Sequence, residues 1–433
     1  MTSTANRIDQ SQTPAPALHG EALPAGAAEA IAAALRFPLY DAILSRRARR
    51  FAVGAELPGG PTAWRSAQPP LPLTPVEQDL LAAAGTGLSG LQLGDWSYAD
   101  QSGQPTGGNA LAAFAGRTGA SPCGIQAAQL FMTDDEQTSL IAVRRHVPSR
   151  GQADALACAV DGVRRHRIRV LDRRVEIPRQ APIMPAFNHW DVNVPGSTVF
   201  MPVSDLTRGL VNNLLMYLDD PHNYYIVDSR SGEEPLKGFT WLNRERPLDL
   251  AEMERGVFTD LVGVEPALMG ENIYLALQAI GLGGWLFSAP RAAALLGALG
   301  FRFEQGRPLG LDGVFEPLVA PYVSGPDEAV QAILDEKWGE GGAYAGAETP
   351  FAARLSVDHQ IPRTSGRAVE AATTLYAYCI RQYGHFPATI PPVAPGVWVQ
   401  AHHLETAFYD HYYGPSSYPA TVKNHKAVWH PAH

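Results

Sequence analysis

The sequence contains little lysine and little cysteine. Only four of its 34 Lys and Arg residues are lysine, so the other 30 are arginine, whose planar guanidinium suits phosphate and carboxylate groups. The three cysteines, Cys123, Cys158 and Cys379, are odd in number and far apart, and they include no CxxC pair. We therefore predict neither a disulfide framework nor a zinc site built from cysteine.

Long apolar runs and targeting signals are also missing. No apolar stretch reaches the roughly 18 residues that a membrane-spanning helix needs. Residues 1–20 lack the basic-then-apolar order of a secretion signal. The net charge of -9 provides no basic field that would attract nucleic acid. We therefore expect a cytoplasmic protein with no membrane and no nucleic-acid partner.

The 433 residues do contain enough apolar material for a sizeable core. Hydrophobic residues make up 45% of the chain and charged residues 18%, which excludes a wholly disordered protein. Residues 1–20 are polar and proline-rich, and we expect them to be a disordered tail. Composition and periodicity predict an α+β fold, with the following helices: 21–36, 39–48, 75–85, 208–218, 265–281 and more within 325–381. Strands are predicted at 127–143, in two pieces around an acidic turn, at 163–178 and at 222–228.

Two of these helices have clear end signals. Thr74 is placed to cap the helix that begins at Pro75, where proline is tolerated in the first turn. The helix at 265–281 is apolar nearly all round, which is typical of a helix in a core or an interface, and we expect it at a dimer seam. Gly281 fits the position after a helix that favours the left-handed conformation.

A cluster of arginines follows the helix at 39–48. Ser45, Arg46, Arg47, Arg49 and Arg50 place four guanidinium groups and a hydroxyl within six residues. Guanidinium groups bind phosphomonoesters through paired, charge-assisted hydrogen bonds, so the cluster is a candidate phosphate site. A solvated charge run explains the same residues, because cations also stabilise the C-terminal end of a helix.

Three glycine-rich segments are candidates for close contact with a flat ligand. They are residues 80–87, residues 116–124, and the stretch that follows the apolar helix, 281–285. Small residues let a ligand approach the backbone closely, although ordinary turns have the same composition. The last segment does not form GxGxxG and follows a helix rather than a strand, so a separate dinucleotide-binding domain is not predicted.

Taken in order, these four segments resemble the nitroreductase-like FMN flavoprotein superfamily. The chain has RRxxRF after a short helix, a helix ending near Gly85, a later SPxG segment, and an apolar helix ending NxxLALQAxGLGGW. The segment GRTGASPCG is most similar to the SagB/McbC-type dehydrogenases, which oxidise azolines in modified peptides. The resemblance covers roughly residues 37–145 and 205–290.

The resemblance implies a nitroreductase-like fold, with a central, mostly antiparallel sheet flanked by helices, and a homodimer with FMN at the subunit interface. It implies an FMN-binding domain at 21–300, with an unmatched insertion at about 145–205. Residues 301–433 would be a C-terminal extension that packs on the core or across the dimer. The residues that it assigns to the phosphate are Ser45, Arg46, Arg47 and Arg49; those near the flavin ring are Ser121, Pro122, Cys123, Gly124, Gly283, Gly284, Trp285 and Leu286.

The implied activity is that of an FMN-dependent oxidoreductase, which would transfer hydride between flavin N5 and a small organic or peptide-derived substrate. NAD(P)H, if used, would stack on the flavin face in turn with the substrate. Arg47 stands where the family usually has serine, and the Lys-Tyr pair of the azoline oxidases is absent, so azoline oxidation is not supported. The pattern identifies no catalytic residue. The alternatives are a flavin-free scaffold that binds a peptide or a partner protein, and a metal enzyme that uses the His-rich C-terminus.

The C-terminal tract, 401–433, holds six of the 13 histidines: His402, His403, His411, His425, His430 and His433. Imidazole and nearby carboxylates are ligands that transition metals use. Adjacent histidines on a regular element point in different directions, however, and the spacing matches no site that we recognise. We therefore predict a structural, aromatic and His-rich tract rather than a metal site.

Two further polar features have both functional and structural interpretations. The cluster at 188–191 contains His189 and Asp191, which could form a general acid/base with its orienting carboxylate or a satisfied structural knot. The arginine-rich strand at 164–174 could bind RNA or a leader peptide. The simpler interpretation is an exposed strand face that charge protects from edge pairing.

Overall fold

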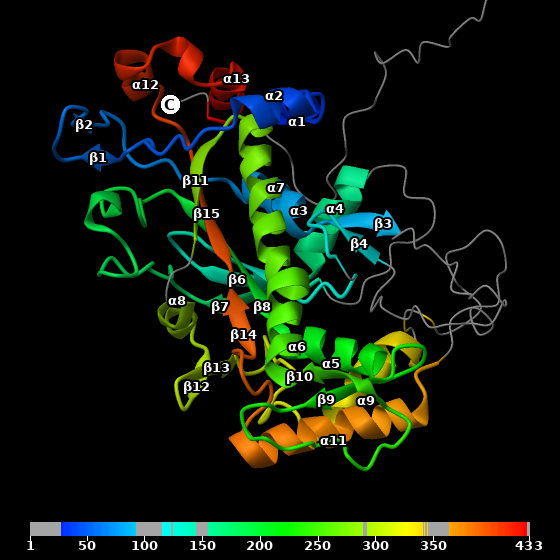
Figure 1. The fold of residues 1–433 in the computed structure, drawn as a ribbon. Helices are drawn as coiled ribbons and strands as arrows, with labels where there is room; N and C mark the ends of the chain where they lie inside the picture. Colours follow the sequence, from blue (N-terminus) through cyan, green and yellow to red (C-terminus); the bar gives the residue numbers. More distant parts are fainter. Residues whose placement is uncertain are drawn as a thin grey trace, which may run out of the picture.

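The computed structural model describes residues 27–91, 115–122, 124–143, 155–288, 292–340, 342, 344 and 363–430. The tail at 1–20 and Cys123 therefore lie outside the described residues. Figure 1 shows a central sheet with helices packed against it and a helical lobe below it. Among the described helices, none combines the length and the hydropathy that crossing a membrane would require.

A seven-stranded sheet, antiparallel throughout, forms the centre of the molecule. The strand order is β11-β15-β8-β5-β6-β7, and β14 also pairs with β8. The predicted central antiparallel sheet flanked by helices is thus confirmed. The strands are β5 (Ala128–Thr133), β6 (Thr138–Ile141), β7 (Arg167–Leu171), β8 (Thr198–Asp205), β11 (Gly283–Ser288), β14 (Val393–Pro395) and β15 (Val397–His402).

Strand β8 is buried along its whole length, because both faces of the sheet are covered. Its side chains alternate between two cores, as the pleat of a strand requires. Phe200 packs in the core under α7 (Glu265–Ile280), whereas Val199 and Met201 pack in the core on the opposite face.

Helices cover one face of the sheet. α7 runs along this face (Figure 1) and packs against α3 (Pro75–Thr86), which in turn packs against α4 (Ala155–Arg165). Leu81, Val160 and Ile273, one from each helix, meet in this core. The two ends of the described chain, α1 (Ala27–Leu35) and α13 (Thr421–Trp429), both pack against α7.

Irregular segments and short elements cover the opposite face. The core there contains Phe131, Trp398 and Phe315, together with Met184 and Val192 from the long segment before β8. The short elements nearby are α8 (Ala292–Ala298), β12 (Arg302–Glu304) and β13 (Arg307–Gly310).

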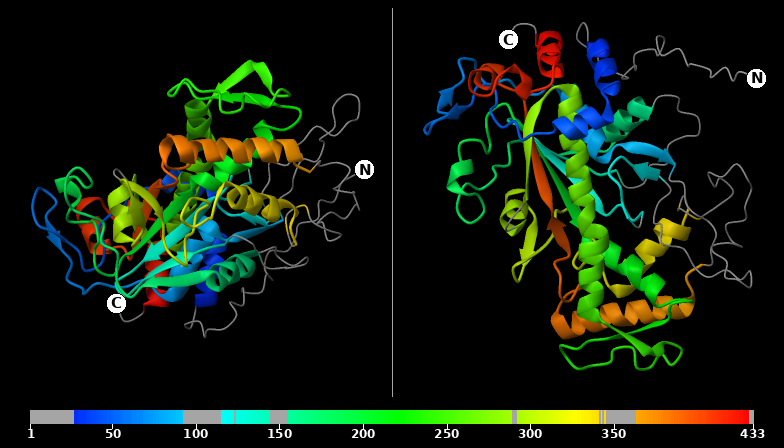
Figure 2. Two further views of the ribbon diagram at one scale, coloured as in Figure 1. Left: turned by 90° about the horizontal axis from the view of Figure 1, so that it is seen from below. Right: turned by 45° about the horizontal axis from the view of Figure 1, so that its top comes forward.

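The helical lobe has its own core, with fully buried residues such as Leu214 and Leu375. Figure 2 shows α11 crossing this lobe as its longest helix. The lobe contains α5 (Leu206–Tyr217), α6 (Leu250–Gly256), α9 (Pro326–Trp338), α11 (Gly366–Tyr383) and the parallel strand pair β9 (Tyr224–Val227) and β10 (Asn243–Asp249).

The remaining elements are short and lie at the surface of the sheet domain or in connections. They are α2 (Leu39–Ser45), α12 (Thr406–Tyr412), the pair β1 (Glu56–Leu57) and β2 (Trp64–Arg65), the pair β3 (Leu88–Leu91) and β4 (Ala115–Arg117), and the turns η2 (Ala186–Asn188), η3 (Val257–Leu261), η4 (Val262–Val264) and η5 (Pro415–Ser417).

Both helix-end predictions are confirmed. The Thr74 hydroxyl accepts a hydrogen bond from the Glu77 N–H, and the Glu77 carboxylate accepts one from the Thr74 N–H, which completes a capping box. Gly281 ends α7 with φ +97°, the left-handed conformation that glycine adopts at least cost.

The predicted arginine strand is wrong in its first part. Residues up to Arg165 belong to α4, and the strand begins at Arg167. Arg164 and Arg167 both pair with the buried carboxylate of Asp79 on α3, whereas Arg165 and Arg169 are exposed. The arginines are therefore divided between the interior and the surface and do not form one wet basic face. β7 lies at the edge of the sheet, where charged side chains discourage pairing with another chain.

The observed sheet crosses the expected domain limits. The expected insertion at 145–205 contributes β7 and the central strand β8. The expected extension at 301–433 contributes β14 and β15, and β15 lies between β11 and β8. Both segments are therefore parts of the main sheet rather than additions to it.

Candidate functional site

The four segments that the sequence analysis singled out all contact one helix, α7. Gly85 and Gly119 lie close to the first half and the middle of this helix. A Cβ on Gly85 would lie 2.7 Å from Ile273, and a Cβ on Gly119 would lie 2.7 Å from Met269. The arginine cluster contacts Glu271 and Gln278 of the same helix, and the last segment continues directly from its end as β11. The fold therefore gathers segments far apart in sequence along about 16 residues of helix.

Three of the four predicted phosphate residues are at least partly exposed. The Ser45 hydroxyl donates to the Asp41 carbonyl at 2.5 Å, at the end of α2. Arg46 pairs with Glu271 of α7 at 3.3 Å, and both side chains remain about two-fifths exposed. One Arg47 nitrogen donates to the carbonyls of Leu44 and Arg46. The guanidinium groups of Arg46 and Arg47 therefore stay accessible to a ligand.

Arg49 differs from these residues, because its guanidinium is buried and hydrogen-bonded within the protein. It is 5% exposed, and its three nitrogens donate to the Ser417 carbonyl at 2.8 Å, to the Ser45 carbonyl at 3.0 Å and to the Gln278 side chain. Burial lowers the pKa of Arg49. All three nitrogens have internal partners, so the structure gives Arg49 a role in joining α2, α7 and the C-terminal segment.

The second and third segments line a small hollow at the N-terminal end of α7. Its walls include Gly85, Gly119, Ser121, Arg117 and Glu265. The empty space amounts to about 230 Å³ with its open side included, below the roughly 300–1,000 Å³ of typical ligand pockets. The residues that the structure describes therefore form a shallow hollow here and not an enclosed cofactor pocket.

Of the predicted ring-contacting residues of the third segment, Ser121 lines this hollow. The Ser121 hydroxyl donates to the buried Glu265 carboxylate at 2.6 Å. Gly124 follows with φ +60°, and Pro122 lies between them in the described part of the turn. Burial raises the pKa of Glu265, although the hydrogen bonds from Ser121 and the Ala128 N–H oppose that shift.

The fourth segment leads into strand β11. The chain's own backbone packs against its glycines and leaves no room there for a ligand. The Gly284 N–H donates to the Arg49 carbonyl at 2.8 Å. A Cβ on Gly284 would lie 2.3 Å from the Gln400 carbonyl oxygen, and a Cβ on Gly283 would lie 2.9 Å from the Arg49 carbonyl oxygen. The chain's own packing therefore accounts for these two glycines. Neither of them has a positive φ.

Trp285 and Leu286 follow on the same strand. The Trp285 ring is 4% exposed and lies 4.2 Å below the Arg50 guanidinium, which also pairs with Asp191 at 2.5 Å. Burial raises the pKa of Asp191, and Arg50 opposes that shift. Leu286 points toward α7, where a Cβ on Gly270 would meet it at 3.2 Å. The Asp191 cluster thus borders β11 and the arginine segment.

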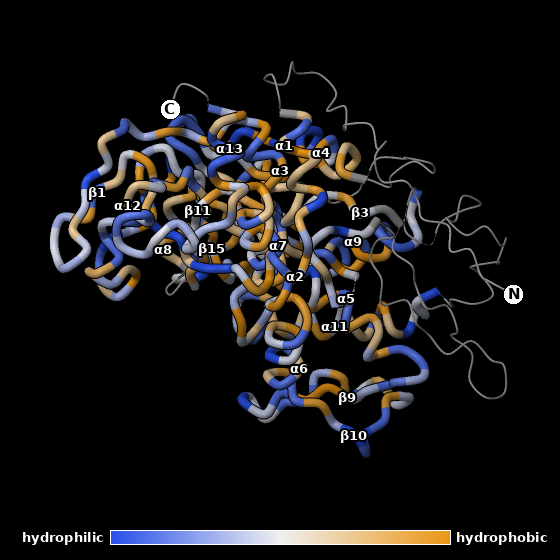
Figure 3. Tube along the Cα trace, turned by 90° about the horizontal axis from the view of Figure 1, so that it is seen from above, coloured by the Kyte–Doolittle hydropathy of each residue, from blue (hydrophilic) through white to orange (hydrophobic). Residues whose placement is uncertain are grey.

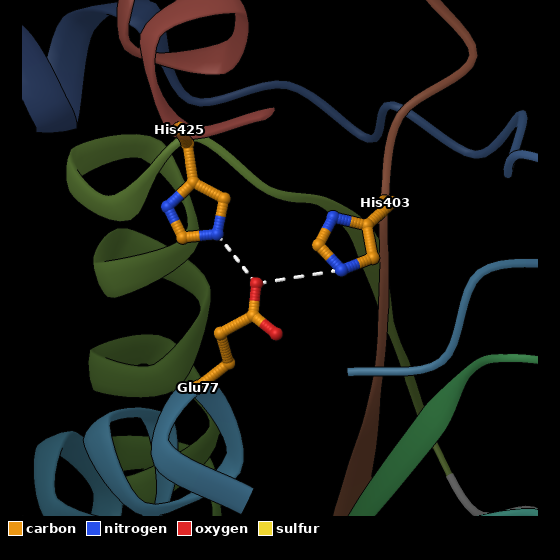
Figure 4. Close-up of side chains that lie close together, drawn as sticks. All are labelled: Glu77, His403 and His425. Atoms are coloured by element: carbon orange, nitrogen blue, oxygen red, sulfur yellow. Dashed lines mark hydrogen bonds and ion pairs between the residues drawn. The ribbon is translucent and has the colours of Figure 1, made fainter. Parts of the chain in front are cut away.

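The C-terminal histidines form a second, separate cluster around Glu77 (Figure 4). The Oε1 atom of Glu77 lies 2.5 Å from His425 Nε2, and 3.4 Å from both His403 Nε2 and His430 Nε2. The ligand atoms of Glu77, His403 and His425 all lie within 4.8 Å of one another. These three residues are at most 4% exposed.

The electrostatics of this cluster favour an ionised carboxylate and a neutral imidazole. Burial raises the pKa of Glu77, yet the three histidines together hold it well below its usual value. Burial lowers the pKa of His403, although Glu77 opposes that shift. A neutral His403 keeps a lone pair on one ring nitrogen, which is the form that binds a metal.

His402 and His403 point in different directions, as predicted for adjacent histidines. His402 Nε2 lies 3.1 Å from the Arg49 carbonyl, whereas His403 is directed at Glu77. Glu77 is the member of the cluster that the sequence analysis missed. In the structure Glu77 also completes the capping box with Thr74, and its histidine partners lie more than 300 residues later in the chain, so no local pattern links them.

Comparison with known proteins identifies no family for this chain. No family model matches it, and no curated protein matches it. Among solved structures, a "putative nitroreductase" from Ralstonia eutropha JMP134 overlaps 61% of this chain and 77% of its own, with 11% sequence identity and a TM-score of 0.31.

Proposed function

We propose that the protein is an FMN-dependent oxidoreductase of nitroreductase-like fold that works as a homodimer. The observation that supports the proposal is the gathering of all four predicted segments along α7. When bound, FMN would supply a two-electron carrier for hydride transfer between NAD(P)H or another donor and a small or peptide-derived substrate.

The residues fit FMN at the phosphate end only. Arg46 and Arg47 keep exposed guanidinium groups on one side of α7, as a phosphate site requires. Arg49, Gly283 and Gly284 are taken up by internal contacts and are not assigned to FMN. The small hollow in one chain agrees with a site that only a second subunit completes.

An apolar patch beside α7 supports the homodimer. On α2, the side chains of Leu39, Tyr40, Ile43 and Leu44 are 44–75% exposed, and Leu268 on the outer face of α7 is 38% exposed. Apolar residues recur along α2 and α7, where the two helices meet (Figure 3). Exposed apolar side chains gathered on one short helix are typical of an interaction site, so we assign this helix and the neighbouring face of α7 to the contact with the second copy.

The phosphate assignment predicts a specific loss of FMN affinity. Each charge-assisted hydrogen bond contributes about 1.5–3 kcal/mol, so Arg46→Ala with Arg47→Ala should weaken FMN binding by at least tenfold. Titration of apoprotein with FMN, followed by quenching of flavin fluorescence, measures the effect. Arg65→Ala with Arg169→Ala removes two exposed arginines elsewhere and should leave affinity unchanged. Wild-type protein that does not bind FMN would refute the proposal.

The dimer assignment predicts that charge on α2 separates the subunits. Tyr40→Asp with Leu44→Asp should convert a dimer to a monomer in light scattering at micromolar concentration, because desolvating two carboxylates opposes association. Neither side chain is needed for folding, since they are 75% and 70% exposed. Phe187→Asp is the matched control. Phe187 is also 75% exposed but lies in the segment over the opposite sheet face. A monomeric wild-type protein would contradict the assignment.

A further inference from the structure

The cluster around Glu77 joins three parts of the chain that are distant in sequence. Glu77 lies in the first turn of α3, His403 directly follows β15, and His425 lies in α13, with His430 just after that helix. Figure 4 shows the imidazoles of His403 and His425 converging on the carboxylate from two sides. The flavin proposal uses none of these residues.

Hydrogen bonds within the cluster do not give every buried imidazole nitrogen a partner. His425 Nε2 and His430 Nε2 can donate to Glu77 Oε1, at 2.5 Å and 3.4 Å, which accounts for two imidazoles. His403 Nε2, in a side chain 3% exposed, is directed at the same oxygen but has no hydrogen-bond partner among the described residues. A buried polar nitrogen without a partner is unfavourable, and a bound cation would use its lone pair.

The spacing of the donor atoms matches metal coordination. With bonds of about 2.0–2.1 Å, the ligand atoms of a tetrahedral zinc ion lie roughly 3.3–3.4 Å apart. His403 Nε2 and His430 Nε2 each lie 3.4 Å from Glu77 Oε1. His425 Nε2, at 2.5 Å, would have to move outward to replace its hydrogen bond with a shared metal. His430 would have to move closer, because the ligand atoms that all lie within 4.8 Å of one another are those of Glu77, His403 and His425.

The surroundings also hold the ligands in place. Glu77 Oε2 accepts the Thr74 N–H at 2.6 Å, which leaves Oε1 facing the histidines. The His403 carbonyl accepts the Val53 N–H at 2.9 Å, and the His425 ring stacks on Trp429 at 5.5 Å. Outer contacts of this kind orient metal ligands and raise affinity.

We propose that Glu77, His403 and His425, with His430 as the fourth ligand, bind one divalent transition-metal ion of the zinc type. Three imidazoles and one carboxylate are ligands that zinc accepts. Four protein ligands in a buried site leave no open position for a substrate, so the ion is structural. It fastens the C-terminal helix α13 to α3 and to the end of β15.

The test uses full-length protein stripped of metal with a chelator. Titration with Zn²⁺ should show one site per chain, and Co²⁺ should give the intense visible absorption of tetrahedral coordination. X-ray absorption of the zinc-loaded wild type should show imidazole scattering with nitrogen and oxygen ligands only. His403→Ala and His425→Ala should each weaken binding by more than about 100-fold, because loss of a ligand exceeds the usual effect of losing an outer contact.

Two further variants separate metal binding from folding. Glu77→Gln keeps an oxygen that can cap Thr74 but removes the charge, so it should fold and still bind zinc at least tenfold more weakly. His411→Ala, an exposed histidine of the same tract, should bind zinc like the wild type. Wild-type protein that takes up no stoichiometric metal would overturn the proposal, as would a zinc site that keeps its affinity in His403→Ala and His425→Ala. FMN binding is measured separately and bears on neither outcome.

Discussion

Gly284→Val is expected to destabilise the protein severely. A Cβ at this position would lie 2.3 Å from the Gln400 carbonyl oxygen and 2.7 Å from Leu277 Cδ1. The first contact is with the backbone of the neighbouring strand β15, so relieving it would break the pairing of β11 with β15. Overpacking typically costs about 1–3 kcal/mol, and we expect a loss of at least about 3 kcal/mol in the free energy of unfolding, measured by urea denaturation.

This expectation replaces the one that the sequence suggested for the same glycine. If Gly284 were instead the point of closest backbone approach to a flavin, the Gly284→Val protein would fold but lose the cofactor. Gly59→Val is the matched control, because a Cβ there meets nothing within 4 Å, and it should be nearly silent. If the Gly284→Val protein kept wild-type stability and lost only FMN, the packing explanation would be wrong.

Arg49→Ala is expected to have the second large effect on stability. The substitution removes three internal hydrogen bonds and leaves Gln278 buried without this partner. Hydrogen bonds to charged groups contribute about 1.5–3 kcal/mol each, so we expect at least about 2 kcal/mol less stability in urea denaturation. Arg49→Lys should recover only part of that loss, because one ammonium cannot replace the planar fork of donors.

Arg47→Ala provides the contrast within the same cluster. Arg47 is exposed and bonds only to carbonyls of its own turn, so its loss should change stability by less than about 0.5 kcal/mol. A stable Arg49→Ala protein with weakened FMN binding would return Arg49 to the phosphate site. A destabilised one would confirm that the cluster is divided between an inner and an outer role.

The sequence by itself determined the local elements. The cap formed by Thr74 and Glu77, the left-handed Gly281 and the strand pair at 128–141 depend on contacts between residues a few positions apart. Their hydrogen bonds and dihedral angles are set by neighbours in the chain, so residue type and spacing are sufficient to predict them. The mixture of helices and strands followed from the same local patterns, whereas the central antiparallel sheet was implied by the family resemblance.

Only the tertiary structure decided which segments became partners. The pairing of β15 with β8 and β11 joins residues about 100–200 positions apart, and no periodicity in the sequence specifies that register. The same holds for Arg49, whose charge pattern predicts an outward anion site although its position beside Gly284 and Gln278 turns it inward. It holds most clearly for Glu77 and His425, which are 348 residues apart and meet because α13 packs on the helices around α7. Local composition cannot encode such a meeting, because it depends on how the whole chain buries its apolar faces.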